Sequence, residues 1–293
     1  MDLQTLSDTP PWDWPTDAAE TILGALRDNV MDDSERRLAA ELAGNHVVIS
    51  DDMAEALLAV VSSPEEGQEL RGTAAIALGP ILEHSDVHGF DDPRNVLVSE
   101  RVEGAIRDSL REVYLDAEVP KEVRRRALEA SVRRQEDWHP EAVRAAFHSG
   151  DDAWKLTAVF CMTHVGGFDD EIVQALESGD PALCHEAVEA AGNWAVDAAW
   201  AYIRSLVGAE DINRELLLTV IAAVGSIRPA EAADALAGLA ESEDDEIADA
   251  VFEALSMAEG LSDAEEDPDF DELDGNDPPL GPSRNGDGSL PPF

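Results

Sequence analysis

The feature that most constrains the fold of this chain is a repeat of about 30 residues. The tripeptide Ser149-Gly150-Asp151 returns 29 residues later as Ser178-Gly179-Asp180, and each copy separates two stretches with helical spacing of apolar residues. Gly179 suits the left-handed position that ends a helix, Asp180 can cap the next helix, and Pro181 suits its first turn. The repeat therefore predicts pairs of helices joined by tight turns, for example 168–177 with 181–193.

The same register extends over most of the chain. A small residue, followed within about six positions by another small residue or a glycine, is typical of inner helices that approach each other closely. The spacing of these positions indicates about seven helix pairs, with one long step that predicts a loop insertion near 83–97. The pattern begins at Ala39, Ala74, Ala127, Ala158, Ala187, Val220 and Ala250, with steps of 35, 53, 31, 29, 33 and 30 residues.

The residues of the inner helices resemble a known family. The stretch from Asp180-Pro181 to Ala191-Gly192 is similar to the second half of a HEAT repeat of the short, phycobilisome-lyase type, whose consensus is D-P-x-V-R-x-x-A-x-x-A-L-G. Val123-Arg124 with Ala127, and Leu70-Arg71 with Ala74, match its V-R-x-x-A core. The resemblance covers roughly 17–260 and implies an all-α fold, an α-α superhelix (α-solenoid). It says little about function, because this fold serves many roles.

The resemblance also implies a structural role for some cations. In HEAT proteins the conserved arginine typically pairs with an aspartate near the turn and helps to set the repeat register. Arg36, Arg71, Arg124 and Lys155 occupy this position, whereas Cys184, Leu217 and Ile247 occupy it in the later repeats. We therefore expect a ladder of basic residues that is incomplete toward the C-terminus.

The charge of the chain is extreme. It has 64 acidic and 20 basic residues, for a formal charge of −44, and only two of its cations are lysines. Such a charge repels phosphate backbones and anionic membranes, which argues against a general nucleic-acid or membrane binder. Because molar salt reduces the Debye length to about 3 Å and so screens self-repulsion, the composition resembles that of proteins from extremely halophilic archaea. Residues 1–261 still carry −35, so the repeat body itself is acidic.

The ends of the chain predict a cap and a tail. Trp12 and Trp14, between prolines in residues 1–16, are expected to cover the exposed end of the first helix pair. Residues 17–261 form the predicted solenoid, and the acidic, proline-rich residues 262–293 are expected to be disordered. The N-terminus has no signal-peptide pattern and the two cysteines form no CxxC pair, so we expect a cytoplasmic protein, monomeric and without a membrane span.

Two histidine-containing segments raise the question of a metal site. HEAT-type deoxyhypusine hydroxylases bind two irons through four His-Glu motifs, but His185-Glu186 is the single such pair here, and its counterparts in neighbouring repeats cannot ligate iron. His84, Asp86 and His88, with Asp91 and Asp92, offer zinc-type ligands if a loop folds them around one point, or else form a solvated loop. Cys161 and Cys184 fall within inner helices and are interpreted as structural.

A cluster of cations in 121–134 stands out against the acidic background. This segment contains six cations and two glutamates. The cations can bind an acidic partner, or they can pair with neighbouring carboxylates of the same protein. The second interpretation is favoured in so acidic a chain. One repeat later, Leu156 and Phe160 fall in the register expected to face the inner surface, unless the helix phase is off by one residue and Phe160 is core. The candidate partner-binding residues are Arg125, Arg126, Glu129, Arg133, Leu156, Phe160, His185 and Glu189.

The sequence favours a non-enzymatic scaffold or adaptor that binds an unidentified protein on the concave face of its inner helices, without a cofactor. The alternative is an enzyme or enzyme accessory related to the phycobilin-lyase HEAT proteins, acting on a tetrapyrrole or a modified protein. Binding of nucleic acid through 121–134 is a weaker third possibility, since it fades steeply with salt.

Overall fold

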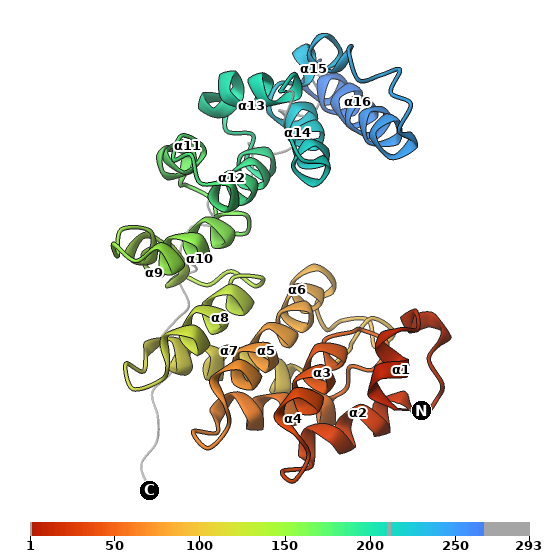
Figure 1. Cartoon of the computed structure of the whole chain (residues 1–293), viewed down its shortest axis with the longest axis vertical. Helices are drawn as coiled ribbons and strands as arrows, with labels where there is room; N and C mark the ends of the chain where they lie inside the picture. The colour runs from red at the N-terminus through yellow and green to blue at the C-terminus, as the bar shows by residue number, and fades with distance from the viewer. Residues whose placement is uncertain (1, 210–211, 267–293) are drawn as a thin grey trace, which may run out of the picture.

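A computed structural model shows helices stacked into a curved array (Figure 1). It describes residues 2–209 and 212–266, without the side chains of 262–266, and this part of the chain contains no strand. The stack curves into a C shape, so that α1–α6 and α14–α16 lie on opposite sides of an opening. None of the described helices has the length and apolar character needed to cross a membrane.

The predicted seven helix pairs are present as an α-solenoid. Each pair consists of an outer helix followed by an inner helix, and inner helices pack against the inner helices of the next pair. The pairs are α2 (Ala18–Arg27) with α3 (Asp33–Ala43), α4 (Asp51–Ser62) with α5 (Gln68–Ala77), α7 (Glu100–Leu115) with α8 (Lys121–Ser131), α9 (His139–Phe147) with α10 (Asp152–Met162), α11 (Asp169–Leu176) with α12 (Pro181–Asn193), α13 (Trp200–Val207) with α14 (Arg214–Ile227), and α15 (Pro229–Leu236) with α16 (Asp245–Glu266).

The turns that suggested the repeat have the expected geometry. Gly150 and Gly179 have φ angles of 77° and 76°, in the left-handed region that glycine tolerates best. Asp151 and Asp180 follow them, and each side chain accepts hydrogen bonds from two backbone N–H groups of the helix that it caps. The repeated tripeptide is therefore an outer-to-inner helix turn in two successive pairs.

Small residues allow the inner helices to approach closely, as the sequence predicted. A Cβ atom at Gly192 would lie 3.0 Å from the Ala223 Cα atom, and one at Gly225 would lie 2.7 Å from the Ala254 carbonyl oxygen. Both glycines are buried on inner helices, so the repeat register is set by backbone contact as well as by apolar side chains.

The basic ladder exists, but its partners differ from the expectation. Arg71 Nε donates to the Val61 carbonyl (2.9 Å), and Arg124 Nε donates to the Tyr114 carbonyl (2.8 Å), in each case ten residues upstream at the end of the outer helix. Arg36 likewise donates to the Leu26 carbonyl (3.1 Å). These arginines satisfy carbonyls that the helix end leaves without partners, so the predicted aspartate partner is wrong. Lys155 instead lies over the Phe147 ring (5.1 Å).

The insertion is partly helical, contrary to the prediction of a loop over 83–97. Helix α6 (Gly79–His88) continues almost directly from α5, and only the residues between His88 and Glu100 are non-helical. Pro80 stands in the first turn of α6, where proline needs no N–H partner. The insertion therefore adds a helix that packs against α7 and α8.

The N-terminal cap involves one of the two predicted tryptophans. Trp14 packs against the core and donates through Nε1 to the Leu6 and Thr9 carbonyls, which places it over the short helix α1 (Leu3–Ser7). Trp12, in the 3-10 turn η1 (Pro11–Asp13), is 80% exposed, so its predicted capping role is wrong. At the other end, α16 extends to Glu266, past the expected end of the solenoid at 261, and the rest of the predicted tail lies outside the described residues.

The apolar core is in two parts that meet at α8. One cluster runs from Leu3 to Ala130 and the other from Leu128 to Ala258. Leu128 and Val132 belong to the second cluster, whereas Val123, Ala127 and Ala130 belong to the first. The contact between α8 and α10 is thus the junction between two halves of the solenoid.

Candidate functional site

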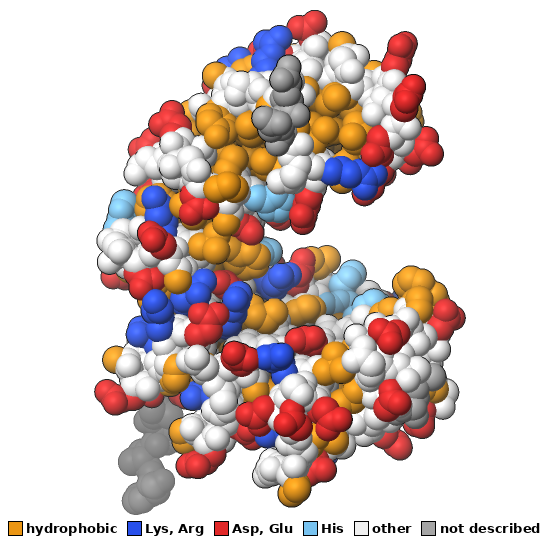
Figure 2. All heavy atoms as spheres, in the orientation of Figure 1, with side chains coloured by type: hydrophobic (Ala, Val, Ile, Leu, Met, Phe, Trp, Pro, Cys, Tyr) orange, Lys and Arg blue, Asp and Glu red, His pale blue; other side chains and the backbone are white. Residues whose placement is uncertain are grey.

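The inner helices line the hollow of the C shape, and we call their exposed surface the inner groove. Figure 2 shows this hollow between the two arms of the molecule, with hydrophobic side chains beside Lys and Arg side chains at the level of α8 and α10. The groove has two halves, one formed by α3, α5 and α8 and the other by α10, α12, α14 and α16.

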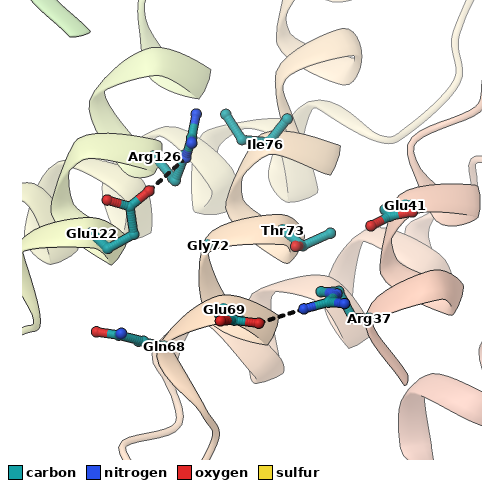
Figure 3. Close-up of a pocket in the computed structure, with 9 residues that line it drawn as sticks. All are labelled: Arg37, Glu41, Gln68, Glu69, Gly72, Thr73, Ile76, Glu122 and Arg126. Atoms are coloured by element: carbon teal, nitrogen blue, oxygen red, sulfur yellow. Dashed lines mark hydrogen bonds and ion pairs between the residues drawn. The ribbon is translucent and has the colours of Figure 1, made fainter. Parts of the chain in front are cut away.

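The first half of the groove holds a cavity of about 400 Å³ whose charged side chains pair with one another (Figure 3). Arg37 of α3 bonds Glu69 of α5, and Arg126 Nε of α8 lies 3.1 Å from a Glu122 oxygen. Gly72 forms part of the wall, since a Cβ there would lie 3.2 Å from the Arg126 Cγ atom. The guanidinium groups that a ligand would meet here already have carboxylate partners.

A buried polar network joins the two halves at the junction of α8 and α10. Arg125 Nε donates to Thr157 Oγ1 (2.9 Å), and that hydroxyl donates to Glu129 Oε1 (2.6 Å). The second Glu129 oxygen accepts from Arg126 Nη1 (2.7 Å). Arg125 and Glu129 are 7% and 6% exposed, so the expectation that they face a partner is wrong: both are buried on α8, where Thr157 of α10 bonds each of them.

Most of the other cations of 121–134 also have carboxylate partners. Lys121 pairs with Asp151 (2.8 Å), Arg133 with Glu83 of α6 (2.6 Å) and Arg134 with the buried Glu103 (3.1 Å). The local positive charge read from the sequence is therefore largely neutralised within the fold, as the acidic composition favoured.

Phe160 lies at the surface beside the junction, partly packed on the core. Its ring is 6.0 Å from the Arg133 guanidinium carbon and 5.6 Å from the His164 ring. Leu156, one turn earlier on α10, is also half-buried. Burial lowers the pKa of His164 and the nearby Arg133 lowers it further, so the imidazole beside Phe160 is neutral at pH 7. The two α10 side chains thus form an apolar spot edged by a cation.

The next inner helix, α12, adds polar groups to this spot. His185 is half-buried, with Nε2 3.3 Å from Thr219 Oγ1 of α14, and Glu189 is exposed. Burial, followed by the charge of Glu189, raises the pKa of Glu186. Within the described residues, no Lys, Arg or His nitrogen lies within 4.0 Å of the Glu186 or Glu189 carboxylates.

The histidine-containing segments do not assemble a metal centre in the part of the chain that the structure describes. No group of three or more His, Cys, Asp or Glu side chains is placed to hold an ion there. The His84 and His88 rings on α6 lie with centroids 4.3 Å apart and planes inclined by 57°, and a His84 ring nitrogen lies 2.8 Å from the Asn95 carbonyl oxygen.

The two cysteines are buried and unpaired, as expected of structural residues. Burial raises the pKa of both thiols, which disfavours the nucleophilic thiolate. Neither thiol therefore has the environment of a catalytic cysteine.

One surface feature was missed by sequence reasoning. Arg111 and Tyr114 of α7 meet Trp138, which precedes α9, on the outer surface of the solenoid. Spacing along one helix gives no signal for such a cluster, because its members come from different repeats.

Comparison with protein-family models agrees with this architecture. Residues 170–256 match the family model for HEAT repeats, which covers most of α11 to α16. This part of the chain is therefore similar to HEAT repeats. Similar solved structures include human deoxyhypusine hydroxylase in complex with glycerol (17% identity, 88% of each chain covered, TM-score 0.39) and Escherichia coli YibA (13% identity, 84% of each chain, TM-score 0.46). An engineered protein is also similar (18% identity, 86% of this chain and 85% of the other, TM-score 0.41). No curated protein matches the sequence significantly.

Proposed function

We propose that the chain is a non-enzymatic interaction scaffold that binds a partner protein on the inner groove beside the α8–α10 junction. The observation that supports this proposal is the apolar spot of Leu156 and Phe160 next to the Arg133 guanidinium. A partly exposed aromatic ring with an arginine at its edge is a common composition of binding hot spots. The surface that we assign to the partner comprises Arg126, Arg133, Leu156, Phe160, His185 and Glu189.

The solenoid architecture suits this role. Stacked helix pairs present a long concave surface on which several successive inner helices contact one partner. Because the hot spot lies where the two core clusters meet, a bound segment would contact both halves of the molecule.

Affinity capture from the source cells at molar salt tests the proposal. Phe160→Asp places a charge in the apolar spot and should abolish recovery of the partner. Val30→Asp is the matched control, since Val30 is 94% exposed between α2 and α3, far along the chain from the spot. Equal recovery by both variants would contradict the assignment of this surface.

We also propose that the protein works as a monomer in the cytoplasm of a salt-accumulating archaeon. The charge of −44 and the shortage of lysine support this habitat. Removal of salt lengthens the Debye length to about 30 Å at 0.01 M, so the carboxylates should repel one another and loosen the fold. Far-ultraviolet circular dichroism should therefore show helix lost below molar salt, whereas full helicity in dilute buffer would contradict the proposal.

A further inference from the structure

The outer surface of the solenoid carries an aromatic cavity between α7 and α9, apart from the inner groove. The cavity has a volume of about 340 Å³, and its lining includes Arg111, Tyr114, Leu115, Trp138, Glu141 and Ala142. Leu115, the last residue of α7, is 61% exposed although it is apolar. An open apolar cavity with polar groups at its edge is the usual form of a ligand site.

The two aromatic rings of the cavity are held in place by the protein. Tyr114 and Trp138 stack with centroids 5.4 Å apart and planes inclined by 30°. Trp138 Nε1 donates to Glu136 (2.9 Å), and the Arg124 guanidinium lies 5.9 Å from the Tyr114 ring. The rings therefore form a platform that needs no rearrangement before a ligand binds.

Two hydrogen-bond donors beside this platform have no partner in the described part of the protein. Arg111 lies over Trp138 (5.8 Å), but no hydrogen bond or ion pair joins its guanidinium to the described residues. This is unusual in so acidic a chain, where most arginines bond a carboxylate or a carbonyl. The Tyr114 hydroxyl also makes no hydrogen bond within the described residues, although burial raises its pKa and so keeps it protonated as a donor.

These features fit a proline-rich segment of low charge. Proline rings pack on aromatic platforms, and the carbonyls of an extended proline-rich backbone accept hydrogen bonds from neighbouring donors. An acidic ligand fits less well, because Glu136, Asp137 and Glu141 line the same surface. A segment without net charge meets neither repulsion from these carboxylates nor a large desolvation cost.

We propose that the cavity binds the proline-rich end of this same chain, residues 278–293. The segment contains Pro278-Pro279-Leu280 and Leu290-Pro291-Pro292-Phe293, and its single Arg284 and single Asp287 give its side chains a formal charge of zero, against −44 for those of the whole chain. The apolar residue beside each proline pair would contact Leu115 and Ala142, while Arg111 and Tyr114 donate to the backbone.

The segment is long enough to reach the cavity. Leu290 follows Glu266, the last described residue, by 24 residues, which span up to about 80 Å when extended. Helices pack about 10 Å apart, so the four repeats between α16 and α7 correspond to about 40 Å.

Disulfide trapping in the full-length chain tests this proposal. Leu115→Cys combined with Leu290→Cys should form an intrachain disulfide under mild oxidation, while the native Cys161 and Cys184 stay buried. The matched control combines Val87→Cys with Leu290→Cys, because Val87 on α6 is 73% exposed but is not part of the cavity lining. Docking raises the local concentration of the thiol introduced in the tail, so the cavity pair should close at least about tenfold faster than the control pair.

Two further variants separate docking from random encounter. Arg111→Ala, or Pro291→Ala with Pro292→Ala, should slow closure of the cavity pair to the control rate. Equal rates for the two cysteine pairs would overturn the proposal, as would insensitivity to both variants. A disulfide-linked dimer in place of the intrachain product would assign the cavity to a second copy and would equally contradict binding within one chain.

Discussion

The two halves of the inner groove use their charges differently. In the half formed by α3, α5 and α8, arginines pair with glutamates of the next inner helix, as in Arg37 with Glu69, or of the same helix, as in Arg126 with Glu122. In the half that begins at α10, the corresponding surface presents Leu156 and Phe160, followed by Glu189 without a cation partner among the described residues. The paired charges of the first half thus contrast with the apolar and unpaired anionic groups of α10 and α12, although Arg214 of α14 pairs with Glu246 of α16 farther along the second half.

This difference shows that repeat register and side-chain role are separate properties. Glu129 and Glu189 occupy the same register two repeats apart, yet the first is buried in a network and the second is exposed. The network at Glu129 exists because the preceding turn of α8 supplies Arg125 and Arg126, while α12 contains no Lys or Arg.

Substitution of these two glutamates should give the largest contrast in stability. Glu129→Ala removes the acceptor of the buried Thr157 hydroxyl and of Arg126, while Arg125 keeps Glu122 as a partner (2.7 Å), so it should cost about 3 kcal/mol of unfolding free energy. Glu189→Ala removes an exposed, unpaired side chain and should change stability by less than about 0.5 kcal/mol. Denaturant unfolding at molar salt measures both, and similar losses would refute the contrast between the halves.

The junction itself should be sensitive to acid through His139. This residue is fully buried, with Nδ1 accepting from the Glu136 N–H (2.8 Å) and Nε2 lying 3.1 Å from Ser131 Oγ. Burial lowers its pKa from 6.5 to about 4, so the folded state holds a neutral ring where the unfolded state binds a proton. The stability from His139 is complete above pH 6.5 and falls as the pH drops to about 4, by about 3 kcal/mol in all.

His139→Gln isolates this contribution from the many carboxylates that titrate in the same range. The variant should be less stable at pH 7 but should lose less stability than the wild type between pH 6.5 and 4. His148→Gln, at an exposed histidine just after α9, should keep the wild-type dependence. An unchanged pH profile in His139→Gln would show that the buried imidazole does not control the junction.

Close packing of the inner helices predicts that a Gly→Ala substitution destabilises the protein on an inner helix and stabilises it on an outer helix. Both changes in stability should be smaller than those above. Gly225→Ala places a Cβ 2.7 Å from the Ala254 carbonyl and should destabilise the protein by about 1–3 kcal/mol. Gly24→Ala in the outer helix α2 meets nothing within 4 Å and should stabilise it by about 0.5–1 kcal/mol. Thermal unfolding of both variants measures these stability changes. Stabilisation by Gly225→Ala would contradict backbone contact as the origin of the repeat register.

The helix pairs were predictable from the sequence because their signals are local. Gly179 and Asp180 specify a turn by their own backbone and capping preferences, and the predicted 181–193 coincides with α12. The helical character of α6 was missed, because His84 and Asp86 were interpreted as loop residues although Pro80 and Ile81 begin a helix on the end of α5.

The candidate site was predictable only in part, because its geometry depends on neighbouring repeats. Phe160 was ambiguous between surface and core, and it is half-buried because Arg133 of the preceding repeat lies against its ring. The sequence predicts Arg125 at the surface, but its side chain is buried at the junction, where Thr157, 32 residues later, accepts its hydrogen bond. The carbonyl partners of the arginine ladder could not be predicted either, since every residue has a backbone carbonyl and the residue type does not indicate which one accepts.

The most direct test of the account compares one apolar side chain from each half of the groove. Phe160→Asp on α10 and Ile76→Asp on α5 place the same charge on the inner surface, and Ile76 is 36% exposed in the wall of the first-half cavity. Affinity capture at molar salt, with folding checked by circular dichroism, should lose the partner with Phe160→Asp and retain it with Ile76→Asp. Loss with Ile76→Asp and retention with Phe160→Asp would place the partner on the other half and contradict the account.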